Sequence, residues 1–339
     1  MTTRARHQIL FKISAVVLSL LATLLFLEIA LRIFGPKYYK FNNQSAVYYT
    51  NPRNYHIPIG KDGNDVIYGL VYTSSQSGYR FPDGTAYIDD RDDSSILGLG
   101  DSFTFGRGVK YEDIYLTVLQ GLIKQGGRDI KIRNCGVIGH DIREVFDTYL
   151  LESSKKRYPI VIYGFVLNDF GLPVRIYGDD QIDLNNGGYA FDPIRKISGL
   201  YNFVCHLIDK KRLHDVTIKA YLKSFRGRNA ENKFNLLREF HRDIKDRDGK
   251  FVIVLFPLLY DFASYPFREI HEKISVFCKG EGILLVDLFP AFSKYRAEEL
   301  WVNPTDHHPN ETAHKIAAGE IYKFFTQNKL LQAIDEKQE

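Results

Sequence analysis

Four stretches of this sequence carry side chains that could together perform acyl transfer. Ser102 follows a short apolar run, and Gly139 and Asn168 follow two later ones. Asp306 and His308 stand shortly before the last helix-like segment. Acyl transfer to a serine needs a nucleophile, a base, a group that orients the base and hydrogen-bond donors for the oxyanion. Because these residue types supply each part, the pattern favours a serine-dependent acyl-transfer site.

Each of these residues also has an ordinary structural use. Ser102 and Asp306 can cap helices, Gly139 can serve a turn, and Asn168 can hold a loop. Two adjacent histidines beside an aspartate also suggest a metal site, but the sequence has no further ligands at an obvious metal-binding spacing. The catalytic interpretation is favoured because the residues follow successive apolar runs along the chain.

The apolar runs are short, rich in Ile and Val, and alternate with helix-like patterns. Such runs are typical of buried parallel strands, and the alternation is typical of a doubly wound α/β sheet. We expect a three-layer αβα fold with five parallel strands at 95–99, 130–134, 160–166, 251–256 and 283–286. Helices are expected at 111–124, 142–154, 231–247 and 267–280. Ligands bind beyond the carboxyl ends of the strands in such sheets, and the candidate residues would all lie there.

The composition argues against several other classes of function. The 339 residues are 45% hydrophobic and 25% charged, which is enough for a packed core. The net charge of +4, without a dense Lys/Arg stripe, argues against nucleic acid as a partner. Cys135, Cys205 and Cys278 allow at most one disulfide and have no zinc-ligand spacing. We therefore expect no metal and no cofactor.

The N-terminal residues favour a membrane anchor. An uncharged apolar run at 13–27 follows Arg4, Arg6 and Lys12. The run alone is shorter than the ~20 residues of a membrane span, but apolar residues continue it. A cleaved signal peptide is an alternative, although no Ala-x-Ala-like site follows the run; a buried soluble helix is another. The basic N-terminus predicts a single-pass protein with its main domain on the extracytoplasmic side.

The composition along the chain also indicates how it is organised. We expect the anchor at 1–35, a juxtamembrane segment packing on the main domain at 36–93, and the main domain at 94–330. The strand–helix alternation breaks at about 170–228, where Gly, Asp, Asn and aromatic residues accumulate. We interpret this stretch as an insertion at the carboxyl edge of the sheet, where it would form part of a substrate cleft.

The segment Gly100-Asp101-Ser102-Phe103-Thr104-Phe105-Gly106 resembles the first sequence block of the SGNH (GDSL) hydrolase superfamily, Gly-Asp-Ser-x-Thr-x-Gly. Gly139 resembles its second-block glycine, Asn168 its third-block asparagine, and His308-Pro309-Asn310 its fifth block. The resemblance implies a flavodoxin-like αβα fold and the activity of an esterase, lipase or acyl transferase. It also implies that Ser102 is the nucleophile, and that the N–H groups of Ser102 and Gly139 and the amide of Asn168 bind the oxyanion.

The last block departs from the usual pattern of this superfamily. The usual block has an aspartate three residues before the catalytic histidine, where this chain has Thr305. Asp306 stands two residues before His308. Some membrane-associated members look similar in having Asp-x-His-Pro, so we assign Asp306 and His308 to the site. A Ser–His dyad without a carboxylate stays open at this point.

The resemblance predicts a serine esterase that acts on O-acyl esters, in first place O-acetyl esters, of an exported glycan or lipid. An O-acetyltransferase that modifies a polysaccharide would use the same site and the same acyl-enzyme. An alternative of another class is a catalytically silent module that binds glycan or supports an export assembly. The displaced aspartate is the feature that favours this last alternative.

Overall fold

The computed structural model describes residues 3–34, 64–67, 70–74, 79–81, 95–171, 176–177, 181–182, 197–303 and 306–335. The chain forms two compact units. The first consists of Met1–Pro52 and Val174–Thr217, and the second of Arg53–Pro173 and Ile218–Glu339. The candidate catalytic residues all belong to the second unit.

A five-stranded parallel sheet forms the centre of the second unit. Its strands are β4 (Ile96–Gly100), β5 (Ile132–Gly136), β6 (Ile160–Phe165), β9 (Lys250–Leu255) and β10 (Leu284–Asp287). They lie in the order β10-β9-β6-β4-β5, and every neighbouring pair is parallel. The first strand along the chain therefore lies between the second and the third, which is the flavodoxin-like doubly wound order. The predicted fold class and all five predicted strands are confirmed.

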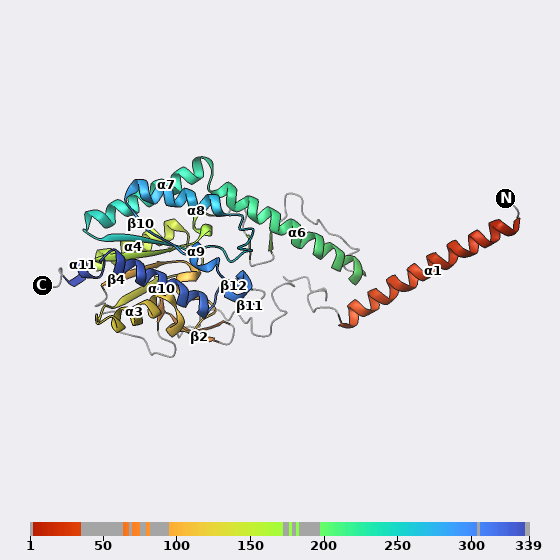
Figure 1. Ribbon diagram of the computed structural model, residues 1–339, viewed down its shortest axis with the longest axis horizontal. Helices are drawn as coiled ribbons and strands as arrows, with labels where there is room; N and C mark the ends of the chain where they lie inside the picture. The colour runs from red at the N-terminus through yellow and green to blue at the C-terminus, as the bar shows by residue number, and fades with distance from the viewer. Residues whose placement is uncertain are drawn as a thin grey trace. The chain divides into compact units, whose positions relative to one another are not determined.

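Helices cover both faces of this sheet. The helix α3 (Tyr115–Gln125) packs against α10 (Glu311–Gln327) on one face. The helices α4 (Ile142–Lys155), α7 (Gly227–Asp246) and α8 (Arg268–Glu281) lie on the opposite face (Figure 1). Each connection between parallel strands has to run from the end of one strand back to the beginning of the next. A helix makes this connection while it covers one apolar face of the sheet.

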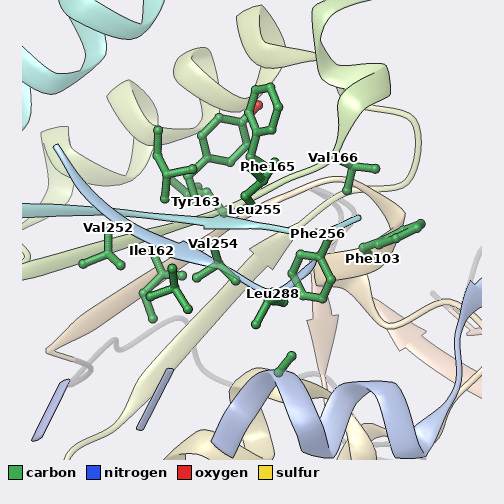
Figure 2. Close-up of a cluster of buried hydrophobic side chains, with 14 of the residues drawn as sticks. Phe103, Ile162, Tyr163, Phe165, Val166, Val252, Val254, Leu255, Phe256 and Leu288 are labelled. Atoms are coloured by element: carbon green, nitrogen blue, oxygen red, sulfur yellow. The ribbon is translucent and has the colours of Figure 1, made fainter. Parts of the chain in front are cut away.

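Side chains that alternate along the central strands form the core between the layers. Figure 2 shows Tyr163 and Phe165 of β6 on one face of the sheet and Ile162 on the other. All three side chains are fully buried. Because both faces of the strand are covered, its sequence is continuously apolar rather than alternating. This explains why the strands could be recognised as short apolar runs.

Three glycines lie side by side at the carboxyl edge of the sheet. Gly100 of β4 pairs in register with Gly136 of β5 and with Gly164 of β6. A Cβ atom on Gly136 would lie 2.5 Å from the backbone nitrogen of Phe105, and one on Gly164 would lie 2.3 Å from Oγ1 of Thr104. The short helix α2 (Ser102–Phe105) therefore approaches the sheet closely only because these positions lack side chains.

The first unit contains the helix α1 and the beginning of the helix α6. The helix α1 (Thr3–Phe34) contains one stretch, His7–Phe34, that is long and apolar enough to cross a membrane. The helix α6 (Gly199–Ser224) starts in this unit and has 26 residues. The sequence analysis placed no helix within 170–228, and α6 occupies part of this stretch; the interpretation of the stretch as an insertion stays a prediction. The weakly amphipathic pattern of α6, with polar residues distributed along it, explains why its helical period was not apparent.

The remaining elements are short. They are β1 (Asn64–Ile67), β2 (Leu70–Ser74), β3 (Arg80–Phe81), β7 (Ile176–Tyr177), β8 (Gln181–Ile182), α9 (Phe289–Phe292), β11 (Trp301–Asn303), β12 (Asp306–Pro309) and α11 (Gln332–Asp335), with 3₁₀ turns at Tyr111–Asp113, Leu167–Phe170 and Ala297–Leu300. Most of the predicted juxtamembrane segment at 36–93 lies outside the described residues. The division of the chain into 1–35, 36–93 and 94–330 stays a prediction.

Candidate active site

Ser102 lies at a sharp turn directly beyond β4. It is the first residue of the single-turn helix α2, and Asp101 caps this helix by accepting a hydrogen bond from the Phe103 N–H at 2.9 Å. The turn is tight because Gly100 has a φ of +151°, a value that L side chains rarely adopt. The Ser102 side chain is 8% exposed and lies at the carboxyl edge of the sheet.

Ser102, His308 and Asp306 form a continuous chain of hydrogen bonds. Nε2 of His308 lies 2.8 Å from Oγ of Ser102, and Nδ1 of His308 bonds to Oδ1 of Asp306. The same carboxylate oxygen accepts the His308 backbone N–H at 3.0 Å. The structure thus brings together three of the residues that the sequence assigned to the site, 206 positions apart in the case of Ser102 and His308.

The backbone of β12 explains the unusual spacing of Asp306 and His308. Alternate residues of a strand point to the same side, and β12 spans Asp306–Pro309. Asp306 and His308 therefore share one side of the strand. His307 stacks on the ring of Trp301, with ring centroids 3.8 Å apart. Thr305, which stands where the superfamily usually has its aspartate, lies outside the described residues.

Asp306 is placed so that its carboxylate stays charged. Its side chain is 2% exposed, and Nη2 of Arg107 lies 3.3 Å from its second oxygen. Burial opposes ionisation, but the charge and the hydrogen bonds of His308 outweigh burial and hold the pKa of Asp306 below its usual value. A buried carboxylate beside Nδ1 selects the imidazole tautomer whose Nε2 can accept the serine proton.

Phe103 supports the imidazole of His308 from the side. The two rings have centroids 5.3 Å apart, and Phe103 also makes an edge contact with Phe256 at 5.7 Å. Phe103 directly follows the nucleophile, so the same turn that presents the serine hydroxyl also packs against the base. Aromatic contacts of this kind restrict the rotation of the ring.

The Asn168 amide is held next to the nucleophile by Asp101. Nδ2 of Asn168 donates to Oδ2 of Asp101 at 3.1 Å, while Oδ1 of Asp101 caps α2. Asp101 is 1% exposed. Burial raises the pKa of Asp101, and the hydrogen bonds from the Phe103 N–H and the Asn168 amide oppose this rise. One side chain therefore ties the turn of the nucleophile to the loop that carries Asn168.

The buried side chain of Asp169 holds the loop that carries Asn168. The Asp169 carboxylate is fully buried and accepts hydrogen bonds from the Tyr163 hydroxyl at 2.8 Å and the Val166 N–H at 3.0 Å. Burial raises the pKa of Asp169 well above its usual value. These contacts set the 3₁₀ turn at Leu167–Phe170, on which Asn168 stands half-buried.

Gly139 lies in the loop between β5 and α4, beyond the same edge of the sheet. It is exposed and has a φ of +85°, and a Cβ atom at this position would meet nothing within 4 Å. The loop leaves β5 through a hydrogen bond from the Val137 N–H to the Gly100 carbonyl at 3.0 Å. Its role as an oxyanion donor stays a prediction.

Sequence reasoning missed two residues that support this site, Asp101 and Arg107. Asp101 was quoted as part of the first block but was given no role. The signal that could have found it is its position before a serine that begins a helix, since aspartate is a common N-cap. Arg107 contacts Asp306 across 199 positions of the sequence, and no local pattern indicates such a contact.

Comparison with known proteins gives a likeness among solved structures only. No family model matches this chain, and no curated protein matches it. A crystal structure of TesA has a TM-score of 0.45 and 11% identity, and the match covers 68% of this chain and 97% of that one. A crystal structure of the acetyl xylan esterase AlAXEase has a TM-score of 0.42 and 14% identity, over 67% of this chain and 98% of that one.

A member of the lipolytic protein G-D-S-L family from Veillonella parvula DSM 2008 has a TM-score of 0.38 and 14% identity, over 68% of this chain and 97% of that one. At these TM-scores the likenesses carry no argument, and the fold rests on the strand order itself. That order agrees with the flavodoxin-like fold that the resemblance predicts, and hydrogen bonds bring His308 to Ser102 and Asn168 to Asp101 at the carboxyl edge of the sheet.

Proposed function

We propose that the protein is a serine esterase that forms an acyl-enzyme on Ser102. The observation that carries this proposal is the hydrogen-bonded chain from Oγ of Ser102 through His308 to the buried carboxylate of Asp306. A structural serine needs no such partner, and a buried charged carboxylate is costly unless it is used or paired. The same chain argues against a silent binding module and against a dyad that lacks a carboxylate.

In the first half of the reaction, Oγ of Ser102 attacks the ester carbonyl while Nε2 of His308 removes its proton. Asp306 holds the imidazole in place and stabilises the imidazolium that forms. The imidazolium then returns its proton to the leaving alcohol oxygen, and the ester C–O bond breaks. The products of this half are the free alcohol and an acyl group on Ser102.

Donors around Ser102 stabilise the oxyanion of the tetrahedral intermediate. In the proposal these are the backbone N–H groups of Ser102 and Gly139 and the side-chain amide of Asn168. An amide nitrogen has two hydrogens, and one of those on Asn168 is directed at Asp101. The other is the donor that the proposal uses, so the bond to Asp101 orients it.

In the second half, Nε2 of His308 removes a proton from a water molecule, whose oxygen attacks the acyl carbonyl. The bond between the acyl carbon and Oγ of Ser102 then breaks, His308 returns the proton to Oγ, and the free acid leaves. A glycan hydroxyl in place of water would make the same site an acyltransferase. Both outcomes use the same residues, so the test below measures the acceptor directly.

We further propose that the substrate is an O-acyl ester, in first place an O-acetyl ester, of an exported glycan or lipid. This proposal is supported by α1, which is long and apolar enough to serve as a single-pass anchor. It is also supported by Arg4, Arg6 and Lys12 before the apolar run, which favour a cytoplasmic N-terminus. A main domain on the other side of the membrane would meet exported glycans and lipid headgroups.

Fluorophosphonate labelling of the full-length protein in detergent tests the nucleophile, with the modified residue mapped by mass spectrometry. We expect the label on Ser102 and its loss in His308→Ala. The matched control is His307→Ala, which changes the neighbouring histidine that stacks on Trp301. Labelling that survives His308→Ala but is lost in His307→Ala would overturn the assignment of the base.

The acceptor is tested with the same protein and an aryl acetate. A hydrolase releases acetate whether or not an oligosaccharide is present. An acyltransferase produces acetylated oligosaccharide, which mass spectrometry detects. A folded protein that neither reacts with the fluorophosphonate nor turns over the aryl acetate contradicts the proposed function.

A further inference from the structure

Hydrogen bonds join the start of α6 to the C-terminal part of α1. The N–H groups of Gly199 and Leu200 each donate to the Glu28 carboxylate at 2.8 Å, and the Ser198 hydroxyl donates to the same carboxylate at 2.9 Å. Oγ of Ser198 also accepts the Tyr201 N–H at 3.1 Å. Three of the four N–H groups that a helix leaves without partners at its start are satisfied here.

Arg32 completes the contact between the two helices. Its Nε lies 2.6 Å from Oε1 of Glu28, and its Nη2 donates to the carbonyl of Ile197. Glu28 and Arg32 are four residues apart, so they share one face of α1. This charged pair therefore binds the chain segment at 197–201 through its polar groups. We call the contacts of Glu28 and Arg32 with this segment the Glu28 clamp.

The Glu28 clamp lies near the C-terminal end of the candidate membrane span, His7–Phe34. The uncharged run ends at Leu27, and α1 continues to Phe34. A helix rises about 1.5 Å per residue, so Glu28 lies about 9 Å before the end of α1. Charged side chains are expensive in the hydrocarbon core and are usual near its boundary. The clamp therefore fixes the start of α6 near the end of the candidate span.

Large apolar side chains are exposed beside the clamp. Ile197 is 69% exposed, Tyr201 40% and Val204 46%. Tyr201 and Val204 are three residues apart on α6, so they share one face. Ile197 directly precedes Ser198, whose hydroxyl accepts the Tyr201 N–H. The end of α1 carries two further exposed apolar residues, Ile33 and Phe34. Tyrosine is enriched at membrane–water interfaces.

We propose that the first turns of α6 form a second membrane contact, with Ile197, Tyr201 and Val204 in the interfacial layer of the lipid next to the anchor. This proposal rests on the membrane anchoring proposed above for α1. The occupant is lipid because the Glu28 clamp holds this apolar face next to the end of α1, which is itself long and apolar enough to cross a membrane. A further consequence is that α1 is a retained part of the fold, since cleavage after it would remove the carboxylate that caps α6.

Quenching by brominated phosphatidylcholine tests the contact in the full-length protein. The protein is reconstituted in vesicles of phosphatidylcholine and phosphatidylglycerol. An environment-sensitive fluorophore is placed on Val204→Cys in a Cys205→Ala background, because Cys135 and Cys278 are buried. Two sites serve as references. Leu18→Cys lies on the exposed face of α1, and Val276→Cys lies on the exposed face of α8, 72% exposed.

We expect brominated lipid to quench the fluorophore at Leu18 and at Val204 at least twofold more than at Val276. Quenching at Leu18 without quenching at Val204 overturns the second membrane contact and leaves the anchor intact. Absence of quenching at both sites overturns the anchor itself. Disulfide cross-linking between Val204→Cys chains, without quenching, would instead show a second copy on this face and would also overturn the proposal.

The Glu28 clamp is tested in the same assay. Glu28→Ala removes the acceptor for two N–H groups of α6, so we expect the quenching at Val204 to fall while that at Leu18 persists. Ser19→Ala, one residue from the labelled site on α1, is the matched control and should leave both values unchanged. Unchanged quenching at Val204 in Glu28→Ala overturns the role of the clamp.

Discussion

The spacing of Asp306 and His308 is set by backbone conformation. An aspartate three residues before a histidine can reach it across a turn, whereas a strand brings residues two apart to the same side. This chain places both residues on β12, and the carboxylate reaches Nδ1 there. The departure from the usual block therefore preserves the interaction while it changes the local structure that provides it.

Asp306→Asn tests this interpretation. The amide would favour the wrong imidazole tautomer and would not stabilise the imidazolium, so we expect kcat for an aryl acetate to fall about 10³- to 10⁴-fold. The exposed Asp246 on α7 offers a matched control, and Asp246→Asn should leave kcat unchanged. A loss below tenfold in Asp306→Asn would show that the enzyme works as a Ser–His dyad.

Asp101→Asn tests whether Asp101 orients the side chain of Asn168. In Asp101→Asn the new amide can keep the bond to the Phe103 N–H only by turning its NH₂ group toward the NH₂ group of Asn168. We expect Asn168 to turn away and kcat to fall about 10²- to 10³-fold, as for loss of one oxyanion donor. The double variant with Asn168→Ala should then lose no more than Asn168→Ala alone. Losses that multiply would show that Asp101 acts independently of Asn168.

At the scale of the elements, α2 depends on the row of glycines at the edge of the sheet. A Cβ atom on Gly100 would lie 2.2 Å from Oγ1 of Thr104 and 2.7 Å from the carbonyl oxygen of Gly164. The φ of +151° adds backbone strain for any other residue. The turn that presents Ser102 is therefore specified by backbone shape as well as by the serine.

Gly100→Ala should lower the free energy of unfolding by about 3 kcal/mol, from the combined clash and strain. Gly121→Ala is the opposite control. It lies exposed in α3, where a Cβ atom meets nothing within 4 Å, and should stabilise the helix by about 0.5 to 1 kcal/mol. Thermal unfolding followed by the fluorescence of Trp301 measures both. Equal melting temperatures for Gly100→Ala and the parent protein would contradict this account.

His314 connects two helices and makes stability depend on pH. It is a fully buried residue of α10, and its Nδ1 accepts the Tyr115 N–H at the start of α3 at 3.2 Å. Burial lowers the pKa of His314 to about 3, with Arg80 and His308 adding to the effect. The unfolded chain takes up this proton near pH 6.5, so between pH 6.5 and pH 3 the unfolded state binds more protons.

Stability should therefore be complete above pH 6.5 and fall as the pH decreases toward 3. His314 should lower the free energy of unfolding by about 2 kcal/mol between pH 6.5 and pH 5. His314→Gln keeps an acceptor for the Tyr115 N–H without a titratable group, so its melting temperature should fall less over this interval. A pH dependence as steep as that of the parent protein would assign the effect to other residues.

The sequence predicted the elements whose signals are local. Buried parallel strands are continuous apolar runs, so the five strands of the sheet and the helices between them were predicted to within a few residues. The helix α6 was missed because its apolar residues do not follow a clear helical period. Contacts such as Arg107 with Asp306 or His314 with Tyr115 join distant positions. No local pattern indicates them, because they arise only from the packing of elements.

For the whole molecule, the anchor proposed for α1 would place the catalytic unit on one side of the membrane. Arg4, Arg6 and Lys12 precede the apolar run, and the other flank also carries basic residues, among them Arg32. Long domains are translocated largely regardless of their own charge, and basic residues next to the first helix usually decide the orientation. We therefore expect the N-terminus in the cytoplasm and the catalytic unit outside it.

A reporter enzyme at the C-terminus tests this orientation. Alkaline phosphatase fused after Glu339 is active only when it is exported, so the full-length fusion should be active in bacterial cells. Replacing Arg4, Arg6 and Lys12 by asparagine leaves the basic residues on the far flank unopposed, and the exported fraction should fall several-fold. The matched control replaces Lys279, Lys315 and Lys323 in the catalytic unit, which removes the same charge far from the anchor in sequence and should leave export unchanged.

An inactive parent fusion, together with fluorescence from a cytoplasmic reporter at the same position, would reverse the orientation. The catalytic unit would then face the cytoplasm, and its substrate would have to be an intracellular ester rather than an exported glycan or lipid.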